Sequence, residues 1–121
     1  MTAIDFNLLV QCGSTPKTFR SGEAIFQEGE PADCLYVLRD GTVDITLGNR
    51  LLTALGAGEI FGEMALIDGA PRSANAIART DVTVIPVNEK QFVFLVGHLP
   101  YFSLSVMRVL AERLRTMNRA L

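Results

Sequence analysis

Residues 61–74 of the chain read Phe61-Gly62-Glu63-Met64-Ala65-Leu66-Ile67-Asp68-Gly69-Ala70-Pro71-Arg72-Ser73-Ala74. A glycine opens a short helical pattern, a glutamate follows it, and a glycine and a proline end it before an Arg-Ser pair. We predict one helical turn over 63–68, with Gly69 as its C-cap and Pro71 preventing its continuation. The alternative interpretation is a buried helical turn followed by a solvated arginine.

The residue types in this stretch indicate a pocket for a compact anion that also carries hydroxyl groups. The first turn of a helix leaves backbone N–H groups without intrahelical partners, and Gly62 would let a ligand approach them closely. Arg72 is a permanent cation whose planar fork matches phosphate oxygens. Glu63 would repel a phosphate, so we expect it to accept a hydrogen bond from another part of the ligand, such as a ribose hydroxyl. One sugar phosphate would then satisfy both residues.

This stretch resembles the phosphate-binding cassette of cyclic nucleotide-binding domains across residues 61–66 and 71–74. Such domains occur in bacterial catabolite activators, protein kinase A regulatory subunits and cyclic-nucleotide-gated channels. The resemblance implies cAMP or cGMP as ligand, with Arg72 on the cyclic phosphate and Glu63 on the ribose 2′-OH. Ser73 would bond the phosphate or an amino group of the base. The expected ligand-binding residues are Phe61, Gly62, Glu63, Met64, Ala65, Leu66, Arg72, Ser73, Ala74 and Arg113.

The region around the cassette, 17–87, has the texture of an all-β domain, because short apolar or alternating runs are separated by turn residues. Asp40-Gly41 predicts a two-residue hairpin turn between the strands on either side, and Gly48-Asn49 predicts a second turn. Many short strands at this spacing favour a β-jelly-roll barrel. The predicted strands are 17–20, 24–27, 34–39, 42–47, 51–55, 74–78 and 82–87.

A second region resembles the first half of the cyclic nucleotide-binding fold. It comprises residues 22–33, the run Leu35-Tyr36-Val37-Leu38 and Gly41. In that family these glycines serve as turn residues of the barrel. The resemblance supports the scaffold and says nothing about chemistry.

Helices are expected on both sides of the barrel, so that residues 1–121 form one mainly β domain with flanking helices. A short N-terminal helix is predicted over 4–12. A helix over 88–97 would have Asn88 as its N-cap, and a long last helix would run over 100–120.

The last helix has an unusually wide apolar sector. On a helical wheel its exposed arginines gather on one side, while the apolar residues span roughly 220°, wider than the ~100° stripe that a single core needs. We therefore expect two apolar surfaces, one on the barrel and one free for another contact. The second surface would contain Leu104, Met107, Ala111, Leu114, Asn118 and Leu121.

Arg113 falls beside apolar neighbours on the wheel, apart from the other arginines. It is either an edge arginine with a wet head group or a residue that points at a ligand between barrel and helix. The family resemblance implies the second role, because the C-terminal helix there acts as a lid over the base. It also implies that the free apolar surface could form a helix-to-helix homodimer.

Composition limits the other functions. Among 121 residues, 11 are Lys or Arg and 13 are Asp or Glu, which gives a net charge of -2 and no basic surface for nucleic acid or anionic membrane. No apolar run approaches a membrane span. Cys12 and Cys34 are expected to be free thiols in a reducing cytoplasm. His98 is the only histidine, so we predict no metal, no cofactor, no catalytic residues and no enzyme.

The leading hypothesis is a stand-alone cyclic nucleotide sensor that moves its last helix to signal to an unknown protein partner. A catabolite-activator regulator is the first alternative. Such regulators carry a helix-turn-helix domain after the long helix, whereas this sequence ends at Leu121, so DNA binding by this chain alone is not expected. The serious competitor is an interaction domain of the same fold with an empty, degenerate pocket. The sequence leaves open cAMP against cGMP, the oligomeric state and membership of a longer protein.

Overall fold

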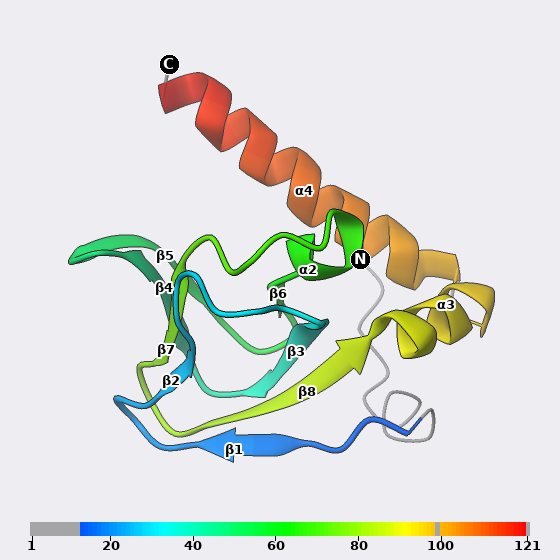
Figure 1. The fold of residues 1–121 in the computed structure, drawn as a ribbon, viewed down its shortest axis with the longest axis horizontal. Helices are drawn as coiled ribbons and strands as arrows, with labels where there is room; N and C mark the ends of the chain where they lie inside the picture. Colours follow the sequence, from blue (N-terminus) through cyan, green and yellow to red (C-terminus); the bar gives the residue numbers. More distant parts are fainter. Residues whose placement is uncertain (1–12, 99, 121) are drawn as a thin grey trace.

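The computed structural model describes residues 13–98 and 100–120, with the side chains of the last helix given at 101–112 and 115. Two antiparallel four-stranded sheets face each other, and helices flank them (Figure 1). The predicted fold class is therefore confirmed. The elements are β1 (Lys17–Phe19), β2 (Ala24–Phe26), β3 (Cys34–Asp40), β4 (Val43–Leu47), β5 (Arg50–Leu55), β6 (Ile60–Phe61), α2 (Met64–Ile67), β7 (Asn75–Ala78), β8 (Val82–Asn88), α3 (Glu89–His98) and α4 (Pro100–Ala120).

The predicted strands are present to within one or two residues, and β6 is a short strand that the sequence did not reveal. One sheet has the order β1-β8-β3-β6 and the other β2-β7-β4-β5. The helix predicted over 88–97 runs from Glu89 to His98, so Gly97 lies inside it. The predicted helix over 4–12 lies outside the described residues.

The β3 strand explains why its sequence is a continuous apolar run. Tyr36 and Leu38 point into the core between the two sheets. Leu35 and Val37 point the other way, into a second core that includes residues of α3 and α4. Because helices cover the outer face of this sheet, both faces of β3 are buried, and the alternation expected of a half-exposed strand is lost.

The predicted hairpin at Asp40-Gly41 is wrong, because β3 and β4 belong to different sheets. Gly41 does adopt the positive φ that such a turn requires, at +94°. A Cβ atom there would lie 2.4 Å from the carbonyl oxygen of Asp81. The glycine is thus needed where the chain crosses tightly from one sheet to the other. An Asp-Gly pair is therefore compatible with such a crossing as well as with a hairpin turn. The turn at Gly48-Asn49 is confirmed, since β4 pairs with β5 directly.

The start of α3 is fixed by a reciprocal pair of hydrogen bonds. The Gln91 N–H donates to Asn88 Oδ1, and the Asn88 N–H donates to Gln91 Oε1, each over 2.9 Å. This is a capping box, which satisfies two donors at the helix N-terminus. The predicted N-cap role of Asn88 is confirmed.

The α4 helix crosses above α2 and then continues past the barrel (Figure 1). Phe102 and Val106 are buried in the second core, and Leu110 packs against it. Met107 is 56% exposed, as expected for a second apolar surface. Arg115 Nη1 lies 3.3 Å from Glu112 Oε2 on the exposed side of the helix. The outward position of the charged residues is thus confirmed for the described side chains.

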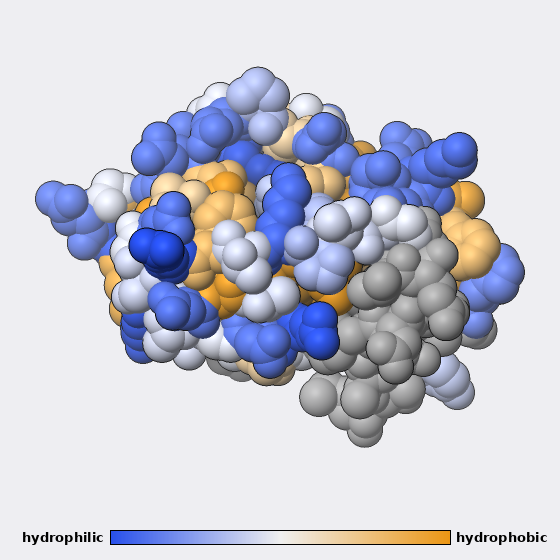
Figure 2. Space-filling model, turned by 90° about the horizontal axis from the view of Figure 1, so that it is seen from below, coloured by the Kyte–Doolittle hydropathy of each residue, from blue (hydrophilic) through white to orange (hydrophobic). Residues whose placement is uncertain are grey.

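The surface of the described residues is mixed in character. Seen from below, an orange apolar area is enclosed by blue hydrophilic side chains (Figure 2). Such a mixture is ordinary for a folded domain and assigns no function. In the part of the chain that the structure describes, no single helix is long and apolar enough to cross a membrane. The residues Glu89–His98 and Tyr101–Glu112 pass that test only as a pair, which is bent by 117°.

Candidate functional site

The backbone of Arg72 is fixed between two loops. The Arg72 N–H donates to the Glu30 carbonyl over 2.9 Å, and the Gly29 N–H donates to the Arg72 carbonyl over 2.8 Å. The loop after β2 and the loop after α2 are therefore joined at this residue. The two regions of sequence resemblance meet here, because Gly29 and Glu30 belong to 22–33 and Arg72 belongs to the cassette.

The Arg72 guanidinium is buried and turned toward the backbone. The side chain is 7% exposed. Its Nη1 donates to the Gly62 carbonyl over 3.0 Å, and its Nη2 donates to the Cys34 carbonyl over 2.8 Å. The Nε atom is also buried and has no hydrogen-bond partner among the described residues. A buried cation with a vacant donor is well suited to bind an anion, because charge-assisted hydrogen bonds are strong in a low-dielectric site.

Aromatic rings lie beneath the guanidinium. The Arg72 Cζ atom is 4.2 Å from the centroid of the Phe26 ring and 5.5 Å from that of Tyr36. The Phe26, Tyr36 and Phe61 rings pack together with centroids 5.4–6.0 Å apart. A cation over an aromatic face is stabilised by the ring quadrupole.

Gly62 provides the space that Arg72 occupies. Its φ is +72°, and a Cβ atom there would lie 2.6 Å from Arg72 Nη1 and 3.3 Å from Phe26 Cε2. The sequence suggested that Gly62 clears the way for a ligand. In the structure its missing side chain makes room for the guanidinium itself.

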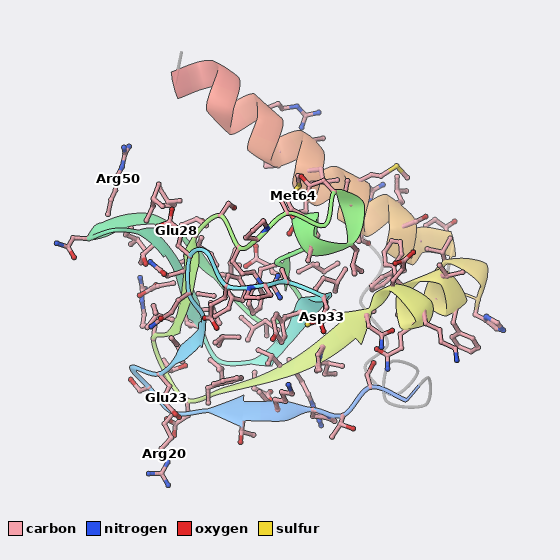
Figure 3. All side chains as sticks on the ribbon, in the orientation of Figure 1. Arg20, Glu23, Glu28, Asp33, Arg50 and Met64 are labelled. Carbon is pink, nitrogen blue, oxygen red and sulfur yellow. The ribbon has the colours of Figure 1, made fainter. Side chains whose placement is uncertain are left out.

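A cleft opens beside Arg72, with about 410 Å³ of empty space counted to its mouth. That figure includes open solvent in front of the cleft. Met64 lies on its rim, on α2 where that helix lies below α4 (Figure 3). The wall is formed by Phe26, Ala32, Ile45, Phe61, Gly62, Met64, Ala65, Ala70, Pro71, Arg72, Ser73 and Ala74.

The structure brings most of the predicted site residues together in this wall. They are Phe61, Gly62, Met64, Ala65, Arg72, Ser73 and Ala74. Leu66 instead packs against the second core, next to α4 residues. Arg113 belongs to α4, but its side chain lies outside the described residues.

Glu63 has a different position from the other cassette residues. Its side chain is completely buried and does not form part of the cleft wall. Its backbone carbonyl accepts the Leu66 N–H over 3.1 Å, which fixes it at the start of the α2 turn. The Ala65 N–H, expected to face the ligand, donates to the Gly62 carbonyl over 3.3 Å. The ribose role of Glu63 stays a prediction.

The sequence missed the part of the wall that comes from outside the cassette. Phe26 and Ala32 lie in the second region of resemblance, residues 22–33, which had been assigned to the scaffold alone. Ile45 lies on the alternating face of β4. The available signal was the alternation itself, since an inward residue of a barrel strand can line a cavity as well as fill the core.

Tyr36 carries the one resolved pKa shift among the described residues. Burial raises the pKa of Tyr36 from 10.0 to about 12, and a side-chain hydrogen bond with Cys34 acts in the same direction. The folded chain therefore favours the neutral phenol. The stabilisation is complete below about pH 10, where the unfolded tyrosine is still protonated, and it is lost as the pH rises to about 12.

We expect the free energy of unfolding of the wild type to fall by roughly 2 kcal/mol between about pH 10 and pH 12 because of this group. Tyr36→Phe lacks the titrating hydroxyl, so its unfolding free energy should fall by that much less. Urea unfolding across this window measures both. Parallel pH profiles for the two proteins would contradict the prediction.

Side chains that could bind a metal ion do not cluster in the part of the chain that the structure describes. Within residues 13–98 and 100–120, no three His, Cys, Asp or Glu side chains come together as a metal site would require. The absence of a metal stays a prediction.

The sequence model described as "Cyclic nucleotide-binding domain" matches residues 16–98, which include both halves of the site. The chain belongs to the cyclic nucleotide-binding domain family. The recognition made from the cassette residues is thereby confirmed.

Relatives of this cyclic nucleotide-binding domain include a CRP-like cAMP-activated global transcriptional regulator of Mycobacterium tuberculosis. It is 35% identical over an alignment of 113 residues, and the match covers 88% of this chain and 50% of that protein. The crystal structure of the Thermus thermophilus catabolite activator protein matches with a TM-score of 0.81 and 30% identity, over 93% of this chain and 55% of that one. The chain thus spans about half the length of the curated relatives it matches.

A third similar protein, the EAL enzyme Bd1971, has been solved with either nucleotide. Its cGMP-bound form matches with a TM-score of 0.64 and 40% identity, over 84% of this chain and 28% of that one. Its cAMP-bound form matches with a TM-score of 0.63 and 38% identity, over 88% and 29%. The curated relatives are regulators, whereas this structural neighbour is an enzyme of which our domain matches less than a third.

Proposed function

We propose that this chain is a sensor domain that binds cAMP or cGMP in the cleft beside Arg72. The observation that carries the proposal is the environment of Arg72. It is a buried cation in the wall of an apolar cleft, and its Nε has no partner among the described residues. A cyclic phosphate would supply both the acceptor and the opposite charge.

The remaining roles follow from the positions of the side chains in the wall. Ser73 would bond the phosphate or an amino group of the base, and the backbone from Gly62 to Ala65 would follow the sugar phosphate. Met64 and Ala74 would contact the sugar and base. Glu63 would accept from the ribose 2′-OH, for which its buried carboxylate would have to meet the ligand at the floor of the cleft.

The signal would be a shift of α4 between docked and undocked positions. Leu66 of α2 packs in the same core as Phe102 and Val106 of α4. A ligand that moves α2 would therefore change the packing under α4. Arg113 would close over the base from this helix.

The comparisons support both nucleotides as candidates. One relative is described as cAMP-activated, and the neighbouring EAL enzyme has been solved with cAMP and with cGMP. The proposal includes a cytoplasmic setting and an unidentified protein partner. It includes no reaction and no DNA binding by this chain. The free apolar surface of α4 would be able to form a homodimer.

Calorimetry with cAMP, cGMP and cyclic dinucleotides tests the proposal on the wild-type chain. We expect at least one cyclic mononucleotide to bind. Absence of binding to all of them at millimolar concentration would refute the proposal. The competing function is an interaction domain with an empty pocket. At a ligand concentration 100 times the Kd, a true binder should melt on the order of 10 °C higher, whereas an empty-pocket domain should not shift.

A further inference from the structure

We infer that Phe26 is a positioning residue of the anion site: its ring holds the Arg72 guanidinium in the orientation in which Arg72 receives an anion. The inference rests on the proposed function. It adds a residue from β2, outside the cassette, whose effect on binding would act through Arg72.

The contacts around the guanidinium separate two kinds of constraint. The Gly62 and Cys34 carbonyls accept from Nη1 and Nη2, so they fix the direction of the guanidinium within its own plane. Hydrogen bonds of this kind leave the plane free to tilt. The Phe26 face, 4.2 Å from Cζ, opposes that tilt. The two carbonyls and the ring together define one orientation.

This orientation matters for binding because arginine has many rotamers. A long side chain that is already ordered loses little further freedom when the anion arrives, so preorganisation raises affinity. The contribution of the ring is also strengthened by burial, since Phe26 is 9% exposed and Arg72 is 7% exposed. Loss of the ring contact would leave the charge in place and remove its fixed direction.

The irregular pairing of β2 orients the Phe26 ring toward Arg72. Its pairing with β7 is irregular between Ala24 and Phe26, and Phe26 lies opposite Ala76. An irregularity of this kind re-aims a side chain. The small side chain of Ala76 leaves room for the ring to turn inward. Phe26 then touches both Arg72 and the cleft.

A graded series of fluorinated phenylalanines at position 26 tests the inference. Fluorine withdraws electron density from the ring face and weakens its attraction for a cation, with little change in ring shape. We expect the affinity for the nucleotide that the wild type binds to fall stepwise with fluorine number, by about two- to thirty-fold in total. The affinity of Phe26→Leu should be as low as that of the most fluorinated variant, or lower. Leu38→Ala, in the same core but outside the cleft wall, is the control for loss of stability: it should be less stable and keep its affinity.

A second measurement does not depend on any nucleotide. In the ligand-free wild type, the ring face should displace the Arg72 Nε–H resonance upfield, and the group should have the high order parameter of a rigid site. In Phe26→Leu the displacement should shrink to the part that the Tyr36 ring, with its centroid 5.5 Å from Cζ, still causes, and the order parameter should fall.

The outcomes distinguish this inference from the proposed function. Nucleotide binding that weakens stepwise along the series supports both. Binding that stays constant along the series overturns the role of Phe26 and leaves the proposed function intact. A wild type that binds no cyclic nucleotide refutes the proposed function. In that case the role of Phe26 is tested only by the Arg72 Nε–H resonance. A resonance that is not displaced upfield, together with a low order parameter, overturns the inference.

Discussion

Arg72→Ala should reduce the affinity for cAMP or cGMP by about 30- to 4,000-fold, because it leaves a buried phosphate without its cation. The effect is large since the guanidinium is 7% exposed and its charge is poorly screened by water. Calorimetry on the folded variant measures the loss. An affinity within threefold of the wild type would show that the anion site lies elsewhere.

Arg79→Ala is the matched control for this substitution. Arg79 also follows the cassette closely in sequence, but its side chain is 48% exposed and pairs over 2.6 Å with Asp44, whose side chain is 23% exposed. Arg79 is not part of the cleft wall, so we expect nearly wild-type affinity. The nucleotide affinity of Arg72→Lys should lie between those of Arg72→Ala and Arg79→Ala. A lysine retains the charge, but it cannot donate to the Gly62 carbonyl, the Cys34 carbonyl and a phosphate in one planar arrangement.

Local sequence signals were sufficient to predict most of the fold and most of the cassette residues that line the cleft. Turn residues and alternation gave the strands, and the cap at Asn88 gave the start of α3. The same signals gave the wrong partner for β3. Gly41 has the φ of a hairpin turn, but what lies next to it is Asp81, a residue distant in sequence. A turn residue reports the local backbone angle and carries no information on which strand pairs with which.

The site shows the same division between local and distant information. The cassette supplies Arg72 and Gly62, which sequence spacing could relate to each other. The Cys34 carbonyl and the Phe26 ring come from other strands, and their contact with Arg72 exists only after both sheets have formed. The role of Glu63 was assigned from its chemistry and from the family resemblance, and its complete burial could not be deduced from residue type. Burial depends on which elements cover the α2 turn.

Gly62→Ala should have the second largest effect on binding, and its reason differs from that of Arg72→Ala. The added Cβ would lie 2.6 Å from Arg72 Nη1, which is the far end of a flexible side chain. The guanidinium should therefore give way, while the backbone stays in place. Phe26 Cε2, 3.3 Å from the same Cβ, limits the directions in which it can move. We expect at least a tenfold loss of nucleotide affinity by calorimetry, together with a lower free energy of unfolding.

Gly48→Ala separates backbone strain from this clash. Gly48 also has a positive φ, at +59°, but a Cβ there would meet nothing within 4 Å. A non-glycine residue in this region costs about 1–2 kcal/mol, so Gly48→Ala should lose that much stability and no affinity. Gly62→Ala should lose roughly 2–4 kcal/mol, because a charge-assisted hydrogen bond is lost in addition to the strain.

The double variant Gly62→Ala/Arg72→Ala tests whether the stability that Gly62→Ala loses beyond the loss in Gly48→Ala is due to displacement of Arg72. If the Cβ acts by displacing the guanidinium, the effect of Gly62→Ala on stability should shrink, in an Arg72→Ala background, to that of Gly48→Ala. Urea unfolding of the two single variants and the double variant gives this coupling. An undiminished effect would mean that the alanine strains the α2 turn itself. In that case the glycine would serve the backbone and not the cation, and the loss of affinity in Gly62→Ala would have to be assigned to the turn.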